Sequence, residues 1–310
     1  MGKPDDSFRQ RAREYAVNLV LQGLLGAARA LPYRWRVPLM GRLTARVVSP
    51  IAGYSQRVRT NLNYVLPDLP EREIRRLERA APDNAGRTMI ELYSAREFKA
   101  RARNAPVSGP GLATARAAAE AGKPVIFVSG HFGSFNAGRV ALVAQGFEMG
   151  VFYRPMSNRY FNRHYVRAMA TLSEPMFEQG RRGTREMVQH LRRGGALGVL
   201  TDINAHDGIP LDFFGKPALS SLNMAELALK FDAPLVPFWG IRAANGIDFE
   251  VTVESPIPHT DAVTMTQAVN DRLEAQVRAH MDQWFWIHRR WKDGTGPVAE
   301  MRLRQWRERT

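Results

Sequence analysis

The 310-residue sequence predicts an α/β fold, with a mostly parallel central sheet flanked by helices and a helical N-terminal extension in front of it. Two observations support this prediction. Short runs of apolar and β-branched residues recur after residue 115, and segments with helical periodicity separate them, as in chains that cross over between parallel strands. We expect one domain over residues 1–310, with a helical part at 1–110, an α/β core at 111–292 and a basic tail at 293–310.

The first segment is expected to be a helix that associates with a membrane surface. Residues 15–28 contain no charge, but this stretch has 14 residues with polar and glycine interruptions, whereas a membrane span needs roughly 20. Apolar side chains from Phe8 to Val20 recur at helical spacing beside several arginines, which is typical of a helix lying in the interface. A helix packed on its own domain fits the same pattern. Acidic residues before the apolar run argue against a signal peptide.

Prolines are expected to divide the rest of the N-terminal part into short helical pieces. We predict no strand before about residue 115, and we predict that residues 71–80 form a highly charged, exposed turn or two. The breaks are expected at Pro32, Pro38, Pro50, Pro67, Pro70 and Pro82.

The core is expected to alternate strands with helices. The predicted strands are residues 124–129, 147–153, 196–201, 234–240 and 249–253. The predicted helices between them are residues 137–144, 158–172, 184–193 and 222–231, and a last helix is expected at 263–287.

Composition and charge limit the chemistry. The absence of cysteine excludes a disulfide framework, a thiolate nucleophile and any sulfur-based metal site. The 44 basic residues, of which only six are lysines, outnumber 30 acidic ones and give a net charge of +14. Residues 1–60 carry +8 and residues 289–310 carry +4, so the body between them is nearly neutral. A basic rim of this kind fits an anionic membrane surface, although a nucleic-acid binder or a soluble arginine-rich protein would also fit.

A candidate catalytic segment, residues 129–136, lies between the first predicted strand and a helix. Active-site groups collect at the carboxyl ends of strands in open α/β sheets, and His131 stands there between two glycines. A histidine in this position can act as a general base at neutral pH, and the alternative is a loop histidine with no role. Asp202 follows another predicted strand, so its carboxylate is expected at the same edge. Neither a Gly-x-Ser-x-Gly elbow nor a phosphate-binding loop is present.

The spacing of the histidines predicts no metal site. The seven histidines include no pair at i, i+4 and no His-x-His.

Further segments combine cations, aromatic rings and polar groups beside predicted strands and helices. Each has a structural alternative, such as a helix cap, a turn or a packed aromatic pair. The segments are Tyr153-Arg154-Pro155 with Asn158 and Arg167, Phe213-Phe214-Gly215 with Pro217, and His288-Arg289-Arg290-Trp291-Lys292.

The order and spacing of these segments, from about Gln56 to Lys292, resemble the late acyltransferases of lipid A biosynthesis, the family that includes bacterial phosphatidylinositol mannoside acyltransferases. The resemblance implies a peripheral protein on the cytoplasmic face of the cell inner membrane. It also implies transfer of a fatty acyl chain from acyl carrier protein or coenzyme A to a hydroxyl of a lipid acceptor. No separate cofactor and no nucleic-acid partner are expected.

The resemblance also implies roles for single residues. His131 would take the proton of the acceptor hydroxyl. Arg154 and Arg167 would bind a phosphate or stabilise the oxyanion, and Asn158 would belong to the same substrate-binding region. Gly133, together with the glycine at position 130, would let backbone amides approach the reaction centre.

Asn136 departs from the family pattern, which places an acidic residue five positions after the histidine. We expect residue 136 to reach back to His131 from the first turn of the next helix. Asparagine can orient the imidazole but brings no charge. Three interpretations stay open: Asp202 supplies the carboxylate, the enzyme acts on a different acceptor, or the protein binds lipid without catalysis.

Three functions therefore remain to be distinguished. The first is an O-acyltransferase acting on a lipid A precursor. The second is an O-acyltransferase for another lyso-lipid, such as an amino-acid-containing lipid. The third, from another class, is a basic protein that binds lipid or nucleic acid.

Overall fold

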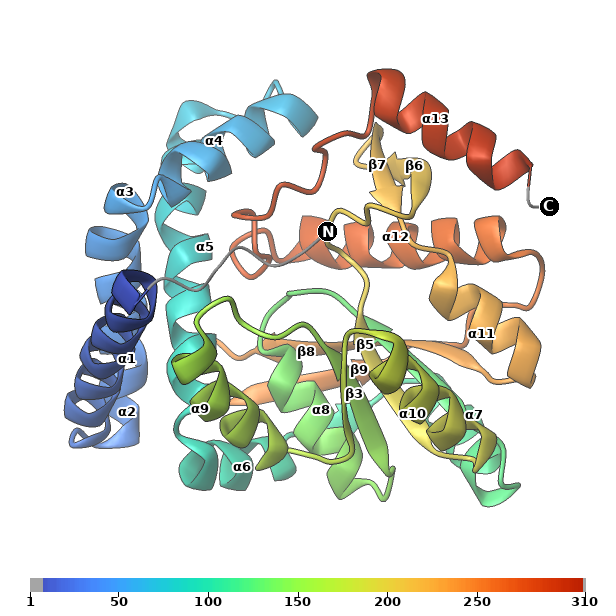
Figure 1. The fold of residues 1–310 in the computed structure, drawn as a ribbon, viewed down its shortest axis with the longest axis horizontal. Helices are drawn as coiled ribbons and strands as arrows, with labels where there is room; N and C mark the ends of the chain where they lie inside the picture. Colours follow the sequence, from blue (N-terminus) through green and yellow to red (C-terminus); the bar gives the residue numbers. More distant parts are fainter. Residues whose placement is uncertain (1–7, 309–310) are drawn as a thin grey trace.

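The computed structural model describes residues 8–308, and their side chains from residue 10 onward. At its centre is a seven-stranded sheet in the order β1-β9-β8-β2-β5-β3-β4 (Figure 1). Neighbouring strands are parallel throughout, except for the antiparallel pair β8 and β9. The strands are β1 (Val107–Ser108), β2 (Val125–Ser129), β3 (Met149–Tyr153), β4 (Met176–Glu178), β5 (Ala196–Leu200), β8 (Leu235–Arg242) and β9 (Phe249–Val253). The predicted α/β class is confirmed.

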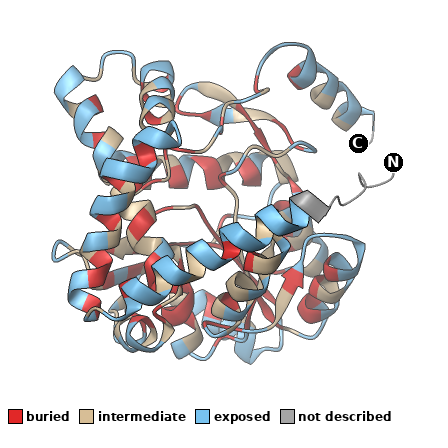
Figure 2. Ribbon diagram, turned by 60° about the vertical axis from the view of Figure 1, so that its left-hand side comes forward, coloured by how far each residue is buried: buried red, intermediate tan, exposed pale blue. Residues whose placement is uncertain are grey.

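Helices cover both faces of this sheet, so its middle strands are buried (Figure 2). Every residue of β2 is buried, which explains why this strand is a continuous apolar run rather than an alternating one. The predicted strands and connecting helices of the core are confirmed, within a few residues at their ends. The helices are α7 (Gly111–Glu120), α8 (Phe135–Ala144), α9 (Arg159–Ala170), α10 (Arg181–Arg192), α11 (Asn223–Phe231) and α12 (Ala262–Ala279).

A two-stranded hairpin, β6 (Ile209–Phe213) and β7 (Lys216–Ser220), was not predicted. Phe214 and Gly215 form its two-residue turn with φ values of 60° and 68°. Positive φ at both positions matches the right-handed twist of the paired strands. Prolines within both strands obscured the strand pattern in the sequence, because proline is uncommon in paired strands.

The N-terminal part is helical, as predicted, but two of its prolines do not break helices. Pro38 lies inside α2 and Pro82 inside α5, where tertiary packing outweighs the lost hydrogen bond of about 3 kcal/mol. The elements are α1 (Phe8–Arg29), α2 (Tyr33–Leu43), the π-helix η1 (Thr44–Val48), α3 (Ser49–Ile51), α4 (Tyr54–Val65), α5 (Glu71–Leu92) and α6 (Ala95–Arg103).

Residues 71–80 are helical, but the prediction that they form only an exposed turn or two was wrong. These residues begin α5, a 22-residue helix whose Ile74, Leu77 and Ala81 are buried. The three side chains pack with Val58 and Leu62 of α4 in one core cluster. The many charges lie on the other face of the helix and masked its apolar spacing. The prediction of no strand before residue 115 was also wrong, because the two residues of β1 are too few to show a pattern.

The last core helix is shorter than predicted. α12 ends at Ala279, and residues 280–295 contain no long helix. Trp284 and Trp286 are fully buried, and Trp284 pairs with Phe132 in an isolated β-bridge. Residues 280–287, which were predicted to end the helix, therefore form an irregular segment packed on the core. The predicted basic tail contains a helix of its own, α13 (Gly296–Arg307).

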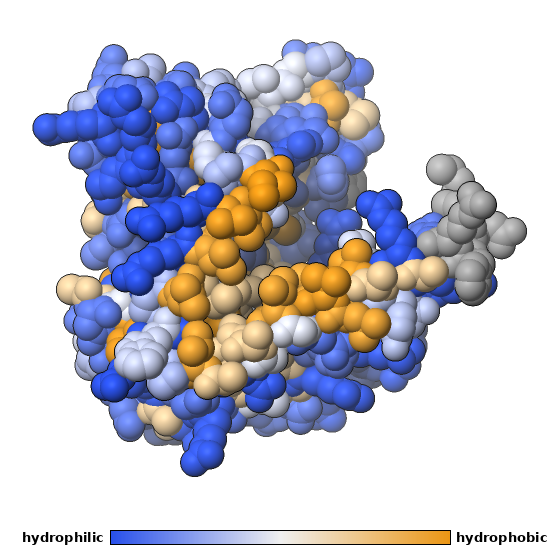
Figure 3. All heavy atoms as spheres, turned by 90° about the vertical axis from the view of Figure 1, so that its left-hand side faces the viewer, coloured by the Kyte–Doolittle hydropathy of each residue, from blue (hydrophilic) through white to orange (hydrophobic). Residues whose placement is uncertain are grey.

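The N-terminal helices carry exposed apolar side chains on one face of the molecule. Figure 3 shows two apolar bands on this face, with a hollow between them. On α1 the exposed residues include Tyr15, Leu19 and Leu24, which agrees with the predicted interfacial pattern, and the side chain of Phe8 lies outside the described residues. Helix α1 also packs on α9. Across residues 8–308, no helix has both the length and the apolar character required to cross a membrane.

Leu77 provides a test of the packing of α5. Its side chain is fully buried, so Leu77→Ala is expected to lower the free energy of unfolding by about 2–5 kcal/mol. Arg72→Ala on the exposed face of the same helix is the control, with an expected change within about 0.5 kcal/mol. Urea unfolding followed by circular dichroism measures both changes. Equal, small effects would contradict a packed α5.

Candidate active site

Two side chains from neighbouring strands meet at one edge of the sheet. His131 follows β2 and Asp202 follows β5, and these strands pair in parallel, with Ser129 opposite Leu200. The Nδ1 atom of His131 lies 2.8 Å from Asp202 Oδ1, and the His131 backbone N–H donates to Asp202 Oδ2 at 2.7 Å. An ionised carboxylate only accepts hydrogen bonds, so Nδ1 carries the proton. Nε2 of the same ring is then the basic nitrogen, and it has no hydrogen-bond partner among the described residues.

Asp202 is fully buried and ionised. Burial alone would raise its pKa, but the adjacent His131 and the hydrogen bonds from it hold the pKa of this carboxyl well below its ordinary value. A third donor is the indole N–H of Trp284, 2.9 Å from Oδ2. The carboxylate is thus surrounded by donors, which is what a buried charge requires. Its charge can stabilise a protonated His131.

The segment after α12 completes this site. The Phe285 backbone N–H donates to the His131 carbonyl at 3.0 Å, and the Phe285 and His288 rings lie beside the imidazole. Asn61 of α4 holds the segment by donating to the carbonyls of Trp286 and His288. We name residues 284–288 the active-site strap. Its positioning role was not predicted, because residues 284–287 were assigned to the last helix; the mixture of aromatics and cations that begins there was a signal.

His288 is a neutral histidine next to the predicted base. Its ring centroid lies 4.5 Å from that of His131, and its Nε2 atom is buried without a hydrogen-bond partner in the described chain. Burial, together with the nearby His131, lowers the pKa of His288 to about 3. It therefore stays uncharged at neutral pH.

His131, Asp202 and His288 are residue types that bind metals. One ligand atom from each lies within 4.8 Å of the other two. Both carboxylate oxygens already accept hydrogen bonds, and His131 uses Nδ1 toward Asp202. A metal bound by all three would have to replace these bonds. The donor set in this arrangement fits a hydrogen-bonded pair rather than a metal centre.

The expectation that residue 136 reaches back to His131 was wrong. Asn136 is buried in the first turn of α8, and no hydrogen bond joins its side chain to His131 in the described structure. Asp202 holds the imidazole instead, which was the first of the three open interpretations. Gly133 has φ of +56°, and a Cβ there would lie 2.1 Å from the Gly240 carbonyl oxygen. Its N–H donates to the Gln283 carbonyl, so this amide does not face the reaction centre as predicted.

The other predicted binding residues lie around α9. Asn158 caps this helix, because its side-chain oxygen accepts from the backbone N–H groups of Tyr160 and Phe161. Its amide donates to the Glu14 carbonyl and thereby ties α9 to α1. Arg154 and Arg167 are exposed, and no contact joins either to the His131–Asp202 pair within residues 8–308. Substrate binding by Arg154, Asn158 and Arg167 stays a prediction.

The two aromatic motifs turn out to build the core under the site. Arg290 is fully buried, donates to the Leu219 carbonyl and to the Ser220 hydroxyl, and lies over the Phe213 ring. Burial lowers the pKa of Arg290 to about 10, so it remains charged. Trp291 stacks on Phe213 and donates to its carbonyl. These residues anchor the strap to the β6–β7 hairpin.

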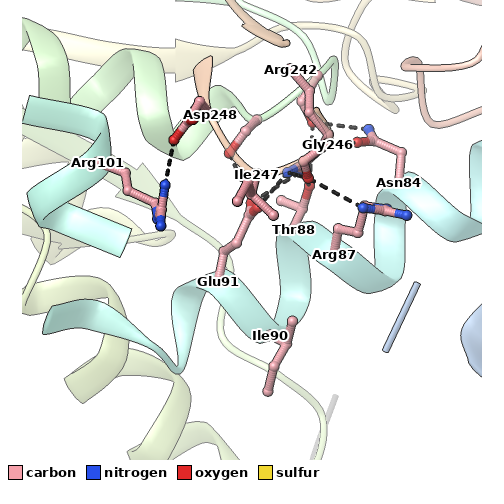
Figure 4. Close-up of polar contacts among 12 residues, drawn as sticks. Asn84, Arg87, Thr88, Ile90, Glu91, Arg101, Arg242, Gly246, Ile247 and Asp248 are labelled. Atoms are coloured by element: carbon pink, nitrogen blue, oxygen red, sulfur yellow. Dashed lines mark hydrogen bonds and ion pairs between the residues drawn. The ribbon is translucent and has the colours of Figure 1, made fainter. Parts of the chain in front are cut away.

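A buried ion pair supports the other side of the His131 loop. Arg242 of β8 pairs with Glu91 of α5 (Figure 4). Glu91 also accepts from the Ser134 hydroxyl. Asn84 accepts from Arg242 and donates to the Gly133 carbonyl at 2.9 Å. Removing one partner of such a buried pair typically costs about 3–5 kcal/mol, because the other charge is left uncompensated. Helix α5 therefore holds the backbone that follows His131.

The fold and this pair of residues define a class: an α/β protein with a candidate general base at the carboxyl end of a central strand. Residues 4–293 match the family described as bacterial lipid A biosynthesis acyltransferase. The chain belongs to this family of lipid acyltransferases.

Curated relatives are more distant. The phosphatidylinositol mannoside acyltransferases of two Mycobacterium tuberculosis strains are each 29% identical to the chain over 102 residues. Those residues are 33% of this chain and 31% of each relative, so the chain matches about a third of the relatives' length.

His288 provides a test by pH. Because its folded pKa is depressed from 6.5 to about 3, the unfolded chain binds more protons than the folded one between these values. Stability is therefore full above pH 6.5 and is lost as pH falls, by up to about 1.4 kcal/mol per pH unit. We expect His288→Gln to flatten this dependence between pH 6.5 and 4.5, the ordinary pKa of glutamate. Urea unfolding at several pH values measures it, and parallel curves for the two proteins would contradict a buried neutral His288.

Proposed function

We propose that the chain is a membrane-associated O-acyltransferase that moves a fatty acyl group from an acyl thioester to a hydroxyl of a lipid acceptor. The observation that carries the proposal is the His131–Asp202 pair, with Nδ1 bound to a buried carboxylate and Nε2 left basic. The thioester is that of acyl carrier protein or coenzyme A. The acceptor is a lipid A precursor, and the reaction takes place on the cytoplasmic face of the inner membrane.

In this mechanism, His131 Nε2 takes the proton of the acceptor hydroxyl as its oxygen attacks the thioester carbonyl carbon. The carbon–sulfur bond breaks, and the departing sulfur receives the proton from the imidazolium. Asp202 fixes the tautomer and stabilises the imidazolium. The chain has no cysteine to carry the acyl group as a thioester, which supports direct transfer between the two substrates.

The exposed apolar side chains of α1, α2 and η1 support a location at the membrane surface. They form the two bands in Figure 3, and the hollow between these bands offers a way in for an acyl chain. Contiguous apolar surface of this kind is unusual on a protein without a partner.

An acyl-transfer assay with the purified chain tests the proposal. Radiolabelled acyl-acyl carrier protein and acyl-coenzyme A are each incubated with a lipid A precursor, a lyso-aminolipid and a phosphatidylinositol mannoside. We expect transfer to the lipid A precursor, and His131→Ala should abolish it. Transfer to the lyso-aminolipid alone would replace the acceptor but keep the mechanism. Full activity of His131→Ala would overturn the mechanism.

Asp202 is expected to act through its charge. Asp202→Asn keeps the shape of the side chain but cannot stabilise the imidazolium, so kcat should fall by roughly 10⁴, as in the Asp→Asn change of the serine-protease triad. Asn136→Asp is the matched control. Because Nδ1 already binds Asp202, a carboxylate at position 136 should not raise kcat. Circular dichroism checks that both variants fold, and an increase of kcat in Asn136→Asp would show that residue 136 assists the histidine.

A further inference from the structure

A cleft of about 950 Å³ lies between α2, η1, α5 and the turn that joins β8 to β9. Eight arginines line it, against two aspartates, Asp83 and Asp282. Clefts lined by one sign of charge focus the electrostatic potential and concentrate ions of opposite sign. The guanidinium fork matches the oxygens of a phosphate group. The cleft therefore has the chemistry of a phosphate site.

The arginines of the cleft differ in how they are neutralised. Arg242 pairs with Glu91, and Arg87 pairs with Asp83, so these two are committed to the structure. The outer arginines of α5 contact glutamates on the surface of the same helix.

The guanidinium groups of Arg42, Arg46 and Arg79 have no ion pair or hydrogen bond with any residue of the described chain. They come from both walls of the cleft, since Arg42 and Arg46 belong to α2 and η1 and Arg79 belongs to α5. Unpaired like charges on facing helices repel one another, and a bound anion relieves that repulsion. We name these three residues the free arginines.

The position of the cleft indicates the source of the phosphate. Arg42 and Arg46 are spaced i, i+4, so they lie on one side of α2 and η1. Leu39, Leu43 and Val47 have the same spacing on an adjacent side and are exposed, continuing the row that Trp35 begins. A row of arginines beside a row of exposed apolar side chains is the arrangement of a helix lying in a membrane interface, with cations at the depth of the lipid phosphates.

We propose that this cleft binds the phosphate groups of anionic phospholipids while the apolar row of α2 and η1 enters the bilayer. The inference rests on the proposed function in taking a membrane as the place of the reaction. It adds a lipid site distinct from the catalytic one, because neither His131, Asp202 nor any residue of the active-site strap lines the cleft. Figure 4 shows Asn84, Arg87 and Arg242 together where α5 meets the β8–β9 turn.

Vesicle binding tests the proposal with the full chain. Sedimentation is compared for vesicles of phosphatidylcholine alone and for vesicles that also contain phosphatidylglycerol. The triple variant Arg42→Glu, Arg46→Glu, Arg79→Glu should bind the anionic vesicles about a hundredfold more weakly than the parent chain, because each arginine at a membrane surface contributes about 1 kcal/mol. On vesicles of phosphatidylcholine alone, the parent chain and the triple variant should bind equally.

A matched triple variant controls for net charge. The control makes the same charge change at three exposed positions on α10 and its C-cap, far from α2 (Figure 1): Arg185→Glu, Arg192→Glu and Arg193→Glu. It should bind vesicles like the parent chain. Equal weakening in both triples would overturn the proposal, since net charge alone would then explain binding. Thermal melting shows whether either triple is unfolded.

Two further measurements keep the assignment to lipid falsifiable. Trp35 is 59% exposed on the apolar row, so brominated phosphatidylcholine should quench its fluorescence, measured as the difference between the parent chain and Trp35→Phe. Binding without this quenching would overturn the proposed orientation. Calorimetry with inorganic phosphate and with acyl carrier protein tests soluble anions. The lipid assignment is wrong if the triple variant of the free arginines binds only these soluble anions more weakly than the parent chain does, while its binding to vesicles is unchanged.

These readouts are independent of catalysis. His131→Ala should bind anionic vesicles like the parent chain. A parent chain that transfers no acyl group would remove the proposed function but leave the vesicle result standing. A parent chain that transfers acyl groups but binds neutral and anionic vesicles equally would remove the phosphate site alone.

Discussion

The site depends on the hydrogen bonds that surround the buried carboxylate of Asp202. A charge removed from water is stable only when donors surround it, and here they are the His131 ring, the His131 backbone and the Trp284 indole. The three groups come from β2 and from the strap, while the carboxylate follows β5. Satisfying one charge therefore fixes three distant parts of the chain relative to one another. Helices α4 and α5 hold two of these parts from outside, so the N-terminal helices belong to the site as much as the sheet does.

The sheet edge that carries His131 and Asp202 could be predicted because its signals are local. His131 and Asp202 each follow an apolar run that is long enough for a buried strand, and parallel strands end at the same edge. Their direct contact depends on β2 and β5 being neighbours, which is a property of strand order and not of either segment. The expectation for Asn136 came from the family pattern and was wrong, because the carboxylate reaches the imidazole from another strand.

The strap and α5 show why the rest could not be predicted. Trp284 follows the buried Val277 of α12 by seven residues, a spacing that a continued helix would also give. A β-bridge from Trp284 to Phe132 and a hydrogen bond from the Phe285 N–H to the His131 carbonyl favour an extended path instead. Only partners far away in the sequence decide between the two. The charges of α5 hid its buried face for the opposite reason: most of them lie toward solvent and take no part in packing. Arg290 belonged to a candidate segment that received no residue role from the sequence, and it stabilises the hairpin under the strap.

The closed environment of Asp202 restricts where protons can travel. Its oxygens accept from the His131 ring, the His131 backbone and Trp284, so Nε2 is the ring nitrogen of His131 that is left to exchange a proton. In the proposed transfer, the hydroxyl that gives up a proton and the sulfur that receives one must therefore occupy the same side of the ring. Both substrates have to be present together before the acyl group moves. The proposed transfer thus requires a ternary complex and sequential kinetics, and it avoids hydrolysis of the thioester only if the acceptor excludes water from Nε2.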